Sequence, residues 1–387
     1  MIFTNIYQHI KSGDELYFRF WANCIIVAGH KKCIIFDLQR GRLMEVSRLF
    51  HDTYEKYKDM PICMISKEDN FINKEGYIKI LDYFITFDFG ILTNDIKTLP
   101  ELSMEYDTPF LVTNAIVEVN SDNDIENMFQ MLKNISTLQV QAIQINDYGH
   151  IKHPHLKRIS ENFSNSQLQC INIYTNYSLQ HYSKLLTIIQ KNNRFRNITF
   201  MCSPKERHYQ DNVYGIAHVH YIKKSIDFKK CGNISKELFV YNQSFFTEAQ
   251  HHNTCLNRKI CIDENGDIKN CPAMKKSYGN IRDTTLKEAI EKPGFKDCWT
   301  ISKDQIDVCK DCEFRYMCTD CRAFIKDPAN PYSQPAKCTY NPYICLWEGQ
   351  DGYVPVEECG TYSRETGFVP DREKIVRLNK QIWNEEE

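Results

Sequence analysis

The chain has 387 residues, 42% of them apolar, so it is long enough to bury a large core and to form two or three domains. Its formal net charge of −2 argues against a nucleic acid or an anionic membrane as partner. No apolar run approaches the roughly 20 residues of a membrane span, and no secretory signal opens the chain, so a reducing, cytoplasmic location is expected.

Residues 1–105 are predicted to form a small module of strands and helices. Three short strands are expected at residues 16–19, 24–27 and 32–37. An amphipathic helix is expected at 45–57, with Val46, Leu49, Phe50 and Tyr54 on one face. A second helix and a strand pair follow through residues 77–92. This combination predicts a winged-helix-like module.

Residues 106–232 alternate between strand and helix patterns. Strands are expected at residues 115–119, 140–145, 170–174, 197–201 and 217–222, and helices at 124–135 and 179–191. Such alternation predicts an α/β fold with a parallel sheet and right-handed crossovers. About five units are fewer than the eight of a closed barrel, so we expect a partial β/α barrel or an open sheet.

Residues 233–387 are rich in cysteine and turn residues, and eight of the seventeen cysteines stand at short spacings. Cys309 to Cys321 read C-x2-C-x5-C-x2-C, after C-x5-C-x4-G-x4-C from Cys255 to Cys271 and before Cys338. Thiolates gathered in this way bind soft metals. Structural zinc usually has a loop of about 15–20 residues between its cysteine pairs, whereas compact spacing is typical of iron–sulfur ligation. Eight thiols fit two [4Fe–4S] clusters; zinc and purely structural cysteines are the alternatives.

The cysteine pattern resembles that of the SPASM domain, C-x(9–15)-G-x4-C, C-x2-C-x5-C-x3-C and C, except that two residues separate Cys318 from Cys321. SPASM domains carry two auxiliary [4Fe–4S] clusters in radical S-adenosylmethionine peptide-modifying enzymes. The resemblance implies two ligand sets. Cluster I would be held by Cys255, Cys261, Cys271 and Cys321, and cluster II by Cys309, Cys312, Cys318 and Cys338.

The C-x3-C-x2-C motif that holds the catalytic cluster of radical S-adenosylmethionine enzymes is missing from the sequence. Residues 120–124 occupy the position after the first strand where this motif is expected. The chain is therefore not expected to bind S-adenosylmethionine or to be a radical enzyme by itself, and its middle region resembles a degenerate form of that barrel. Together with residues 252–260 and 268–272, these features resemble the SPASM-domain peptide maturase of "grasp-with-spasm" systems.

That resemblance implies an iron–sulfur maturation factor for a ribosomally synthesised peptide, which binds the precursor peptide and acts with an ATP-grasp ligase. The alternatives are a peptide-modifying redox enzyme that uses the auxiliary clusters, and a zinc-stapled scaffold. Within this picture the first module would recognise the precursor by strand addition at residues 32–37, beside the helix at 45–57. A packing domain without a ligand is the other interpretation of that module.

The remaining cysteines and the histidines have simpler interpretations. Five cysteines in apolar runs are expected to be buried: Cys24, Cys33, Cys63, Cys170 and Cys202. Four others near the cluster region are interpreted as ordinary thiols, although each could be a spare ligand: Cys231, Cys298, Cys345 and Cys359. His251 and His252 are interpreted as paired surface histidines, with a ligand or proton donor near the first cluster as the alternative. His218 and His220 alternate along a strand and face one side, which would hold substrate in an active barrel and carries relics in a degenerate one. No catalytic acid or base is assigned.

Overall fold

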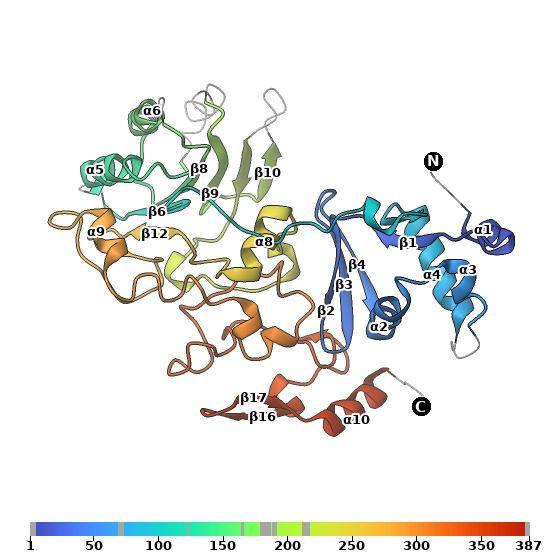
Figure 1. The fold of residues 1–387 in the computed structure, drawn as a ribbon. Helices are drawn as coiled ribbons and strands as arrows, with labels where there is room; N and C mark the ends of the chain where they lie inside the picture. Colours follow the sequence, from blue (N-terminus) through green and yellow to red (C-terminus); the bar gives the residue numbers. More distant parts are fainter. Residues whose placement is uncertain are drawn as a thin grey trace.

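The computed structural model describes residues 5–68, 73–121, 124–163, 166–178, 187, 192–210 and 217–383. It is a mixed α/β protein with an N-terminal module, a central sheet and a C-terminal region made mostly of loops (Figure 1). No helix in these residues is long and apolar enough to cross a membrane.

The N-terminal module is a three-stranded antiparallel sheet, β2-β3-β4, followed by three helices, with a strand pair β1-β5 beside it. Its elements are α1 (Ile6–Ser12), β1 (Tyr17–Phe20), β2 (Cys24–Ala28), β3 (Lys32–Asp37), β4 (Arg42–Ser47), α2 (Arg48–Tyr57), α3 (Ile62–Ile65), α4 (Lys74–Thr86), β5 (Gly90–Thr93) and the 3-10 helix η1 (Ile96–Thr98). The winged-helix likeness stays a prediction.

Three expectations for this module were wrong. The helix begins at Arg48 and not at residue 45, because Glu45 and Val46 pair with β3 in strand β4 and Ser47 caps the helix. Leu49 is 76% exposed and does not share the buried face. Strand β3 lies between β2 and β4, so it has no free edge for strand addition; the edges of this sheet are β2 and β4.

In the described residues the central sheet has eight strands in the order β10-β11-β9-β8-β7-β6-β12-β13, and it ends there at β10 and β13, so it is open. The strands from β11 to β12 run parallel. Its middle-region elements are β6 (Asn114–Val119), α5 (Asp124–Ser136), β7 (Ala142–Asp147), α6 (His153–Asn162), β8 (Cys170–Asn176), β9 (Phe195–Met201), β10 (Arg207–Gln210) and β11 (His218–Tyr221). The five expected strands are present, whereas the helix expected at 179–191 lies outside the described residues apart from position 187.

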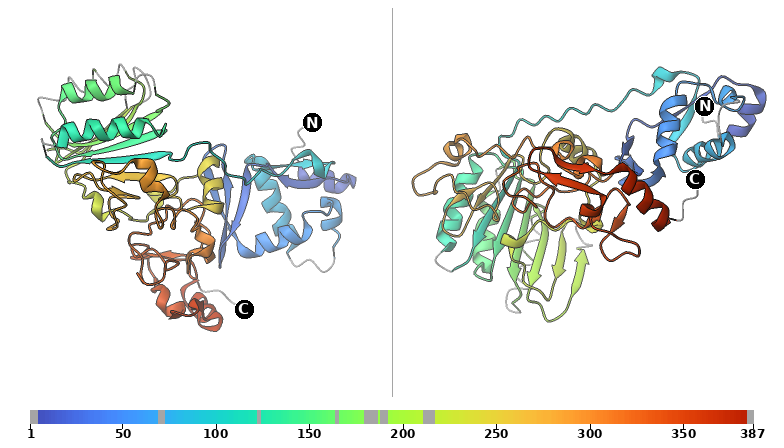
Figure 2. Two further views of the ribbon diagram at one scale, coloured as in Figure 1. Left: turned by 60° about the vertical axis from the view of Figure 1, so that its left-hand side comes forward. Right: turned by 90° about the horizontal axis from the view of Figure 1, so that it is seen from below.

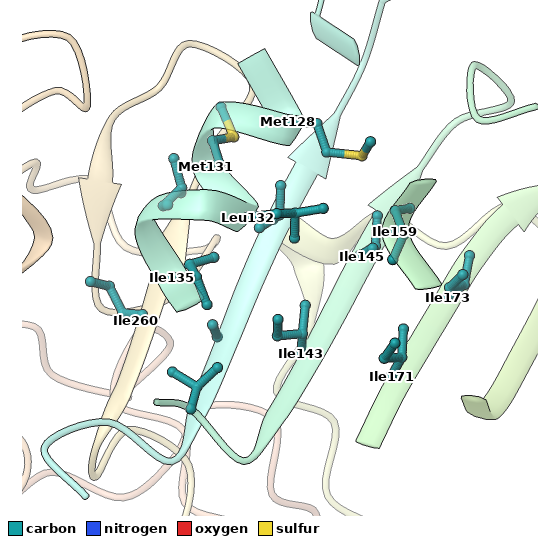
Figure 3. Packing of buried hydrophobic residues seen from close by; sticks show 14 of the residues in the cluster. Met128, Met131, Leu132, Ile135, Ile143, Ile145, Ile159, Ile171, Ile173 and Ile260 are labelled. Carbon is teal, nitrogen blue, oxygen red and sulfur yellow. The ribbon is translucent and has the colours of Figure 1, made fainter. Parts of the chain in front are cut away.

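The two faces of the central sheet differ in character. Helices α5 and α6 cover one face, where Met128, Leu132 and Ile135 pack against Ile143 and Ile171 (Figure 3). Alternate residues of each strand point to the opposite face, and polar residues gather there. Aligned on this face are Gln144 of β7, Asn172 of β8 and Asn197 of β9. The apolar face is covered by the helices, and the polar face is directed toward the C-terminal region.

The C-terminal region contributes two strands to the central sheet, because β12 pairs in parallel with β6. The rest of it is short elements joined by loops, as its turn-rich sequence predicts. The elements are η2 (Phe228–Lys230), η3 (Lys236–Leu238), α8 (Gln243–His251), β12 (Lys259–Ile262), β13 (Ile268–Lys269), α9 (Leu286–Glu291), η4 (Lys303–Gln305), η5 (Cys309–Asp311), β14 (Tyr340–Asn341), β15 (Leu346–Trp347), η6 (Val356–Cys359), β16 (Gly360–Ser363), β17 (Gly367–Pro370) and α10 (Arg372–Trp383).

The N-terminal sheet packs against the C-terminal region (Figure 2). Ile34 and Phe36 of β3 lie in one apolar cluster with Phe246 and Phe314. The tip of the β2–β3 hairpin is hydrogen-bonded to the segment around Cys312: the His30 N–H donates to the Asp311 carbonyl at 2.7 Å, and Arg315 donates to the Ala28 carbonyl at 2.7 Å. A Cβ on Gly29 would lie within 2.9 Å of Glu313, so this close approach needs glycine. The two parts therefore meet at a cysteine loop.

Candidate metal centres

The first cysteine set lies where the C-terminal region joins the central sheet. Cys255 follows α8, and the Asn253 side chain turns the chain there by accepting the N–H groups of Cys255 and Leu256 at 3.0 and 2.8 Å. Cys261 lies in β12, and Cys271 follows β13. Cys321 comes from a loop more than 40 residues further along the chain. Folding of the β12–β13 hairpin onto β6 thus positions three of the four thiols.

Electrostatic interactions show which of these thiols lie together. Burial raises the pKa of Cys271 to about 12, and the neighbouring Cys255 thiolate adds to that shift. Burial and Cys255 likewise raise the pKa of Cys321. Cys261 is fully buried, and besides burial the carboxylate of Glu118 and the thiolate of Cys271 raise its pKa. Cys321 therefore has Cys255 as an electrostatic neighbour, and its assignment to the first cluster stays a prediction.

The second set is gathered around a buried lysine. Burial raises the pKa of Cys309 and of Cys318 to about 11, while the Lys303 ammonium partly offsets both shifts. Lys303 Nζ lies 3.5 Å from Cys318 Sγ and 4.0 Å from Cys309 Sγ. Burial raises the pKa of Cys338, and the Cys309 thiolate is the next largest cause of that shift. Besides burial, the thiolates of Cys309 and Cys338 also raise the pKa of Cys312. The structure thus brings the four predicted cluster II thiols together.

The backbone around several of these cysteines points N–H groups at sulfur. Four thiols receive a hydrogen bond from the residue two positions later: Cys271 from Ala273, Cys321 from Ala323, Cys312 from Phe314 and Cys338 from Tyr340. Hydrogen bonds to sulfur stabilise the thiolate form and tune iron–sulfur clusters. These turns suit metal-bound thiolates better than they suit packed thiols.

Each set also has its own cation, which the sequence did not single out. Lys259 Nζ lies 3.5 Å from Cys255 Sγ, and although burial alone would lower the pKa of Lys259, the thiolates of Cys255 and Cys271 raise it. Lys303 is only 3% exposed. A four-thiolate cluster is anionic, and a buried anion needs a nearby opposite charge. The donor sets therefore fit iron–sulfur clusters in both chemistry and charge.

All seventeen cysteines lie in the described part of the chain and are free thiols. Cys24, Cys33 and Cys63 are buried as expected, whereas Cys202 is exposed at a positive φ at the end of β9, which corrects the expectation for that residue. Cys345 and Cys359 are buried in apolar clusters, and Cys298 packs against the central core. Cys231 is exposed and lies beside Cys321.

The histidines lie elsewhere. His251 Nε2 lies 3.0 Å from the Met104 carbonyl, and the His252 ring packs against Tyr106. His218 and His220 of β11 face His208 of β10, with His208 Nδ1 3.1 Å from His220 Nδ1. In the described residues, no three or more His, Cys, Asp or Glu side chains are arranged to hold a single metal ion.

Comparison with known proteins identifies the cysteine-rich segment. Residues 254–313 match the family model of the SPASM iron-sulfur cluster-binding domain, and they contain Cys255, Cys261, Cys271, Cys309 and Cys312. No curated protein matches the chain. Among solved structures, Streptococcus suis SuiB aligns at 10% identity over 83% of this chain and 98% of that chain, with a TM-score of 0.25. Residues 254–313 are therefore similar to a SPASM iron–sulfur cluster-binding domain, and their strands β12 and β13 extend the central α/β sheet.

Proposed function

We propose that this protein is an iron–sulfur maturation factor for a ribosomally synthesised peptide. In this proposal it holds two [4Fe–4S] clusters, binds the precursor peptide and acts with an ATP-grasp ligase. The observation that carries the proposal is the combination of two thiol sets, each with its own lysine, with a sequence that lacks C-x3-C-x2-C. Such clusters supply electron transfer or iron ligation when bound; the chain has no cysteines for the radical-generating cluster.

A groove in the N-terminal module is the candidate site for the precursor. It has a volume of about 550 Å³ and lies between strand β4 and helix α4. Met44 and Val46 line it from β4, and Ile80 and Tyr83 line it from α4. In the described residues β4 pairs only with β3, so the backbone of its other edge is free to pair with an added strand. An extended peptide would bond to that edge and place alternate side chains in the groove.

The groove is connected to the second cysteine set through the N-terminal sheet. Strand β3 joins β4 to the β2–β3 hairpin, whose tip contacts the loop that carries Cys312. A peptide held at β4 would thus be connected to the second cysteine set through paired strands and the hydrogen bonds at the hairpin tip. This arrangement fits a protein that presents a peptide at a fixed position.

A binding titration tests the proposal. A fluorescently labelled peptide with the leader sequence encoded beside this gene is expected to bind the full chain, and Ile80→Glu should abolish binding because it places a charge in the apolar groove. Val369→Glu, at an exposed apolar position on β17, is the matched control and should bind normally. No binding to the wild-type chain and none of the chain to the neighbouring ligase would overturn the proposal.

A redox enzyme is the second candidate function, and a small cavity favours it. About 180 Å³ of space lies against the polar sheet face, lined by Gln144 and Asn172 on one side and by Cys255 and Lys259 on the other. A side chain of a peptide could reach the first set there. Anaerobic incubation of the loaded protein with precursor and reductant, followed by mass spectrometry, tests this; an unchanged peptide mass would exclude it. Iron and sulfide analysis separates both candidates from a zinc scaffold.

A further inference from the structure

The first cysteine set has a fifth thiol beside it. Cys231 follows the 3-10 helix η2, about 90 residues before Cys321 in the chain, yet the Cys231-Gly232 segment lies directly on Cys321. A Cβ on Gly232 would stand 2.6 Å from Cys321 Sγ and 3.1 Å from Cys321 Cβ. Gly232 also has a φ of +90°, which favours glycine. The backbone is therefore shaped to bring this segment against the Cys321 thiol.

A hydrogen bond holds the segment in place. Lys337 Nζ donates to the Cys231 carbonyl at 2.6 Å and also to the Lys230 carbonyl. Lys337 immediately precedes Cys338, a thiol of the second set. Lys337 thus holds the Cys231 backbone, and Lys337 itself is next to a thiol of the second cysteine set.

The thiol of Cys231 interacts with the members of the first set. Besides burial, the thiolates of Cys321 and Cys255 raise the pKa of Cys231. In turn, Cys231 raises the pKa of Cys271 and contributes to the raised pKa of Lys259. Cys231 therefore shares Cys255 and Lys259 as electrostatic neighbours with Cys271, whereas Cys261 interacts with Cys271 and Glu118. Cys261 is also fully buried in strand β12, whereas Cys231 is exposed.

We propose that Cys231 is a thiolate ligand of the first cluster and competes with Cys261 for one iron. This inference rests on the proposed binding of iron–sulfur clusters. Cys231 loses its proton when its sulfur binds iron, and the displaced Cys261 thiolate takes up a proton, so the exchange changes neither the charge nor the oxidation state of the site. Because Cys231 is exposed, its thiol would place this ligand position at the solvent-accessible surface of the chain.

Alkylation of the full chain provides the first test. The protein is reconstituted anaerobically with ferrous iron and sulfide, treated with N-ethylmaleimide and analysed by mass spectrometry, beside cluster-free protein. We expect Cys231 to react at least about tenfold more slowly in the loaded protein, because a metal-bound thiolate is no longer a free nucleophile. The exposed Cys202 is the control and should react equally in both. Equal reactivity of Cys231 in both forms would overturn the inference.

Substitutions separate ligation from simple shielding. Cys231→Ser should change the electron paramagnetic resonance spectrum of the reduced first cluster, since either the serine oxygen or the Cys261 thiolate replaces the Cys231 sulfur on one iron, and Cys202→Ser should not. An unchanged spectrum for Cys231→Ser would overturn the inference even if alkylation is slowed. Cys231→Ala and Cys261→Ala are each expected to keep both clusters, whereas the double variant should lose about four irons per chain.

Loss of about four irons in Cys261→Ala alone would show that Cys231 cannot replace it, and would overturn the inference. A wild-type chain that binds no iron would overturn the proposed function together with this inference. Alkylation and spectroscopic results obtained with the cluster-loaded protein, by contrast, test only whether Cys231 is a ligand.

Discussion

The side-chain amide of Asn253 donates a hydrogen bond to the Asp320 carboxylate at 2.5 Å, and this contact joins the two cysteine sets. Asn253 positions Cys255 in the first set, and Asp320 lies in the chain between Cys318 of the second set and Cys321 of the first. Asp320 also pairs with Arg322 at 2.6 Å and lies 3.8 Å from Lys303 Nζ. A buried, charged network therefore connects the sets.

Asp320→Asn should destabilise the C-terminal region by about 3–5 kcal/mol, because it leaves Arg322 buried without its counter-charge and removes one of the negative groups beside Lys303. Chemical denaturation followed by far-ultraviolet circular dichroism measures the loss, and the absorption of both clusters should decline together. Asp351→Asn, at an exposed position, is the control and should unfold like the wild type. An unchanged unfolding midpoint for Asp320→Asn would contradict the structural role of the network.

Lys303→Met should lower the reduction potential of the second cluster. A reduced cluster carries one more negative charge, and the ammonium 3.5 Å from Cys318 Sγ stabilises that charge in a buried site. A redox titration monitored by electron paramagnetic resonance measures the potential. Lys310→Met is the matched control, since Lys310 lies in the same cysteine loop but is exposed. Equal shifts in both variants would rule out a specific effect of Lys303.

Glu118→Gln should stabilise the protein above neutral pH. Glu118 is only 2% exposed, and burial followed by the Glu264 carboxylate raises its pKa to about 7. Between pH 4.5 and about 7 the folded state therefore keeps a proton on Glu118 that the unfolded state has released. The protonated carboxyl favours folding at low pH, and this contribution to the free energy of unfolding is lost as pH rises through about 7. Melting temperatures from pH 5 to pH 8.5 check the prediction. The difference between variant and wild type should grow by at most about 1.4 kcal/mol per pH unit; a constant difference would contradict it.

Cys312→Ala should remove the second cluster and destabilise the C-terminal third, because the free energy of metal binding acts there as folding free energy. Iron content should fall from about eight to about four per chain. Cys202→Ala, at an exposed cysteine outside both sets, should change neither iron content nor stability. Full iron content and unchanged melting in Cys312→Ala would remove Cys312 from the ligand set.

Features that depend on residues close together in the chain were predictable. The spacing of Cys309, Cys312 and Cys318 predicted a metal-binding loop, and the SPASM family model matches residues 254–313, which include Cys309 and Cys312. Five of the eight strands described in the central sheet were predicted from their apolar runs. The start of α2 was not, because residues 42–47 fit either a helix face or a strand until their pairing with β3 is known.

By itself the sequence determined the cysteine set, the α/β alternation and the lack of the radical motif, since each is a matter of residue type and local spacing. Only the tertiary structure decided that β4 is an edge strand of the N-terminal sheet and that Lys259 and Lys303 stand at the thiols. It alone placed Cys231 against Cys321 and Asn253 against Asp320, 67 residues apart. Buried charged and thiol groups need hydrogen-bonding or oppositely charged partners, and residues distant in the chain supply these partners only after folding.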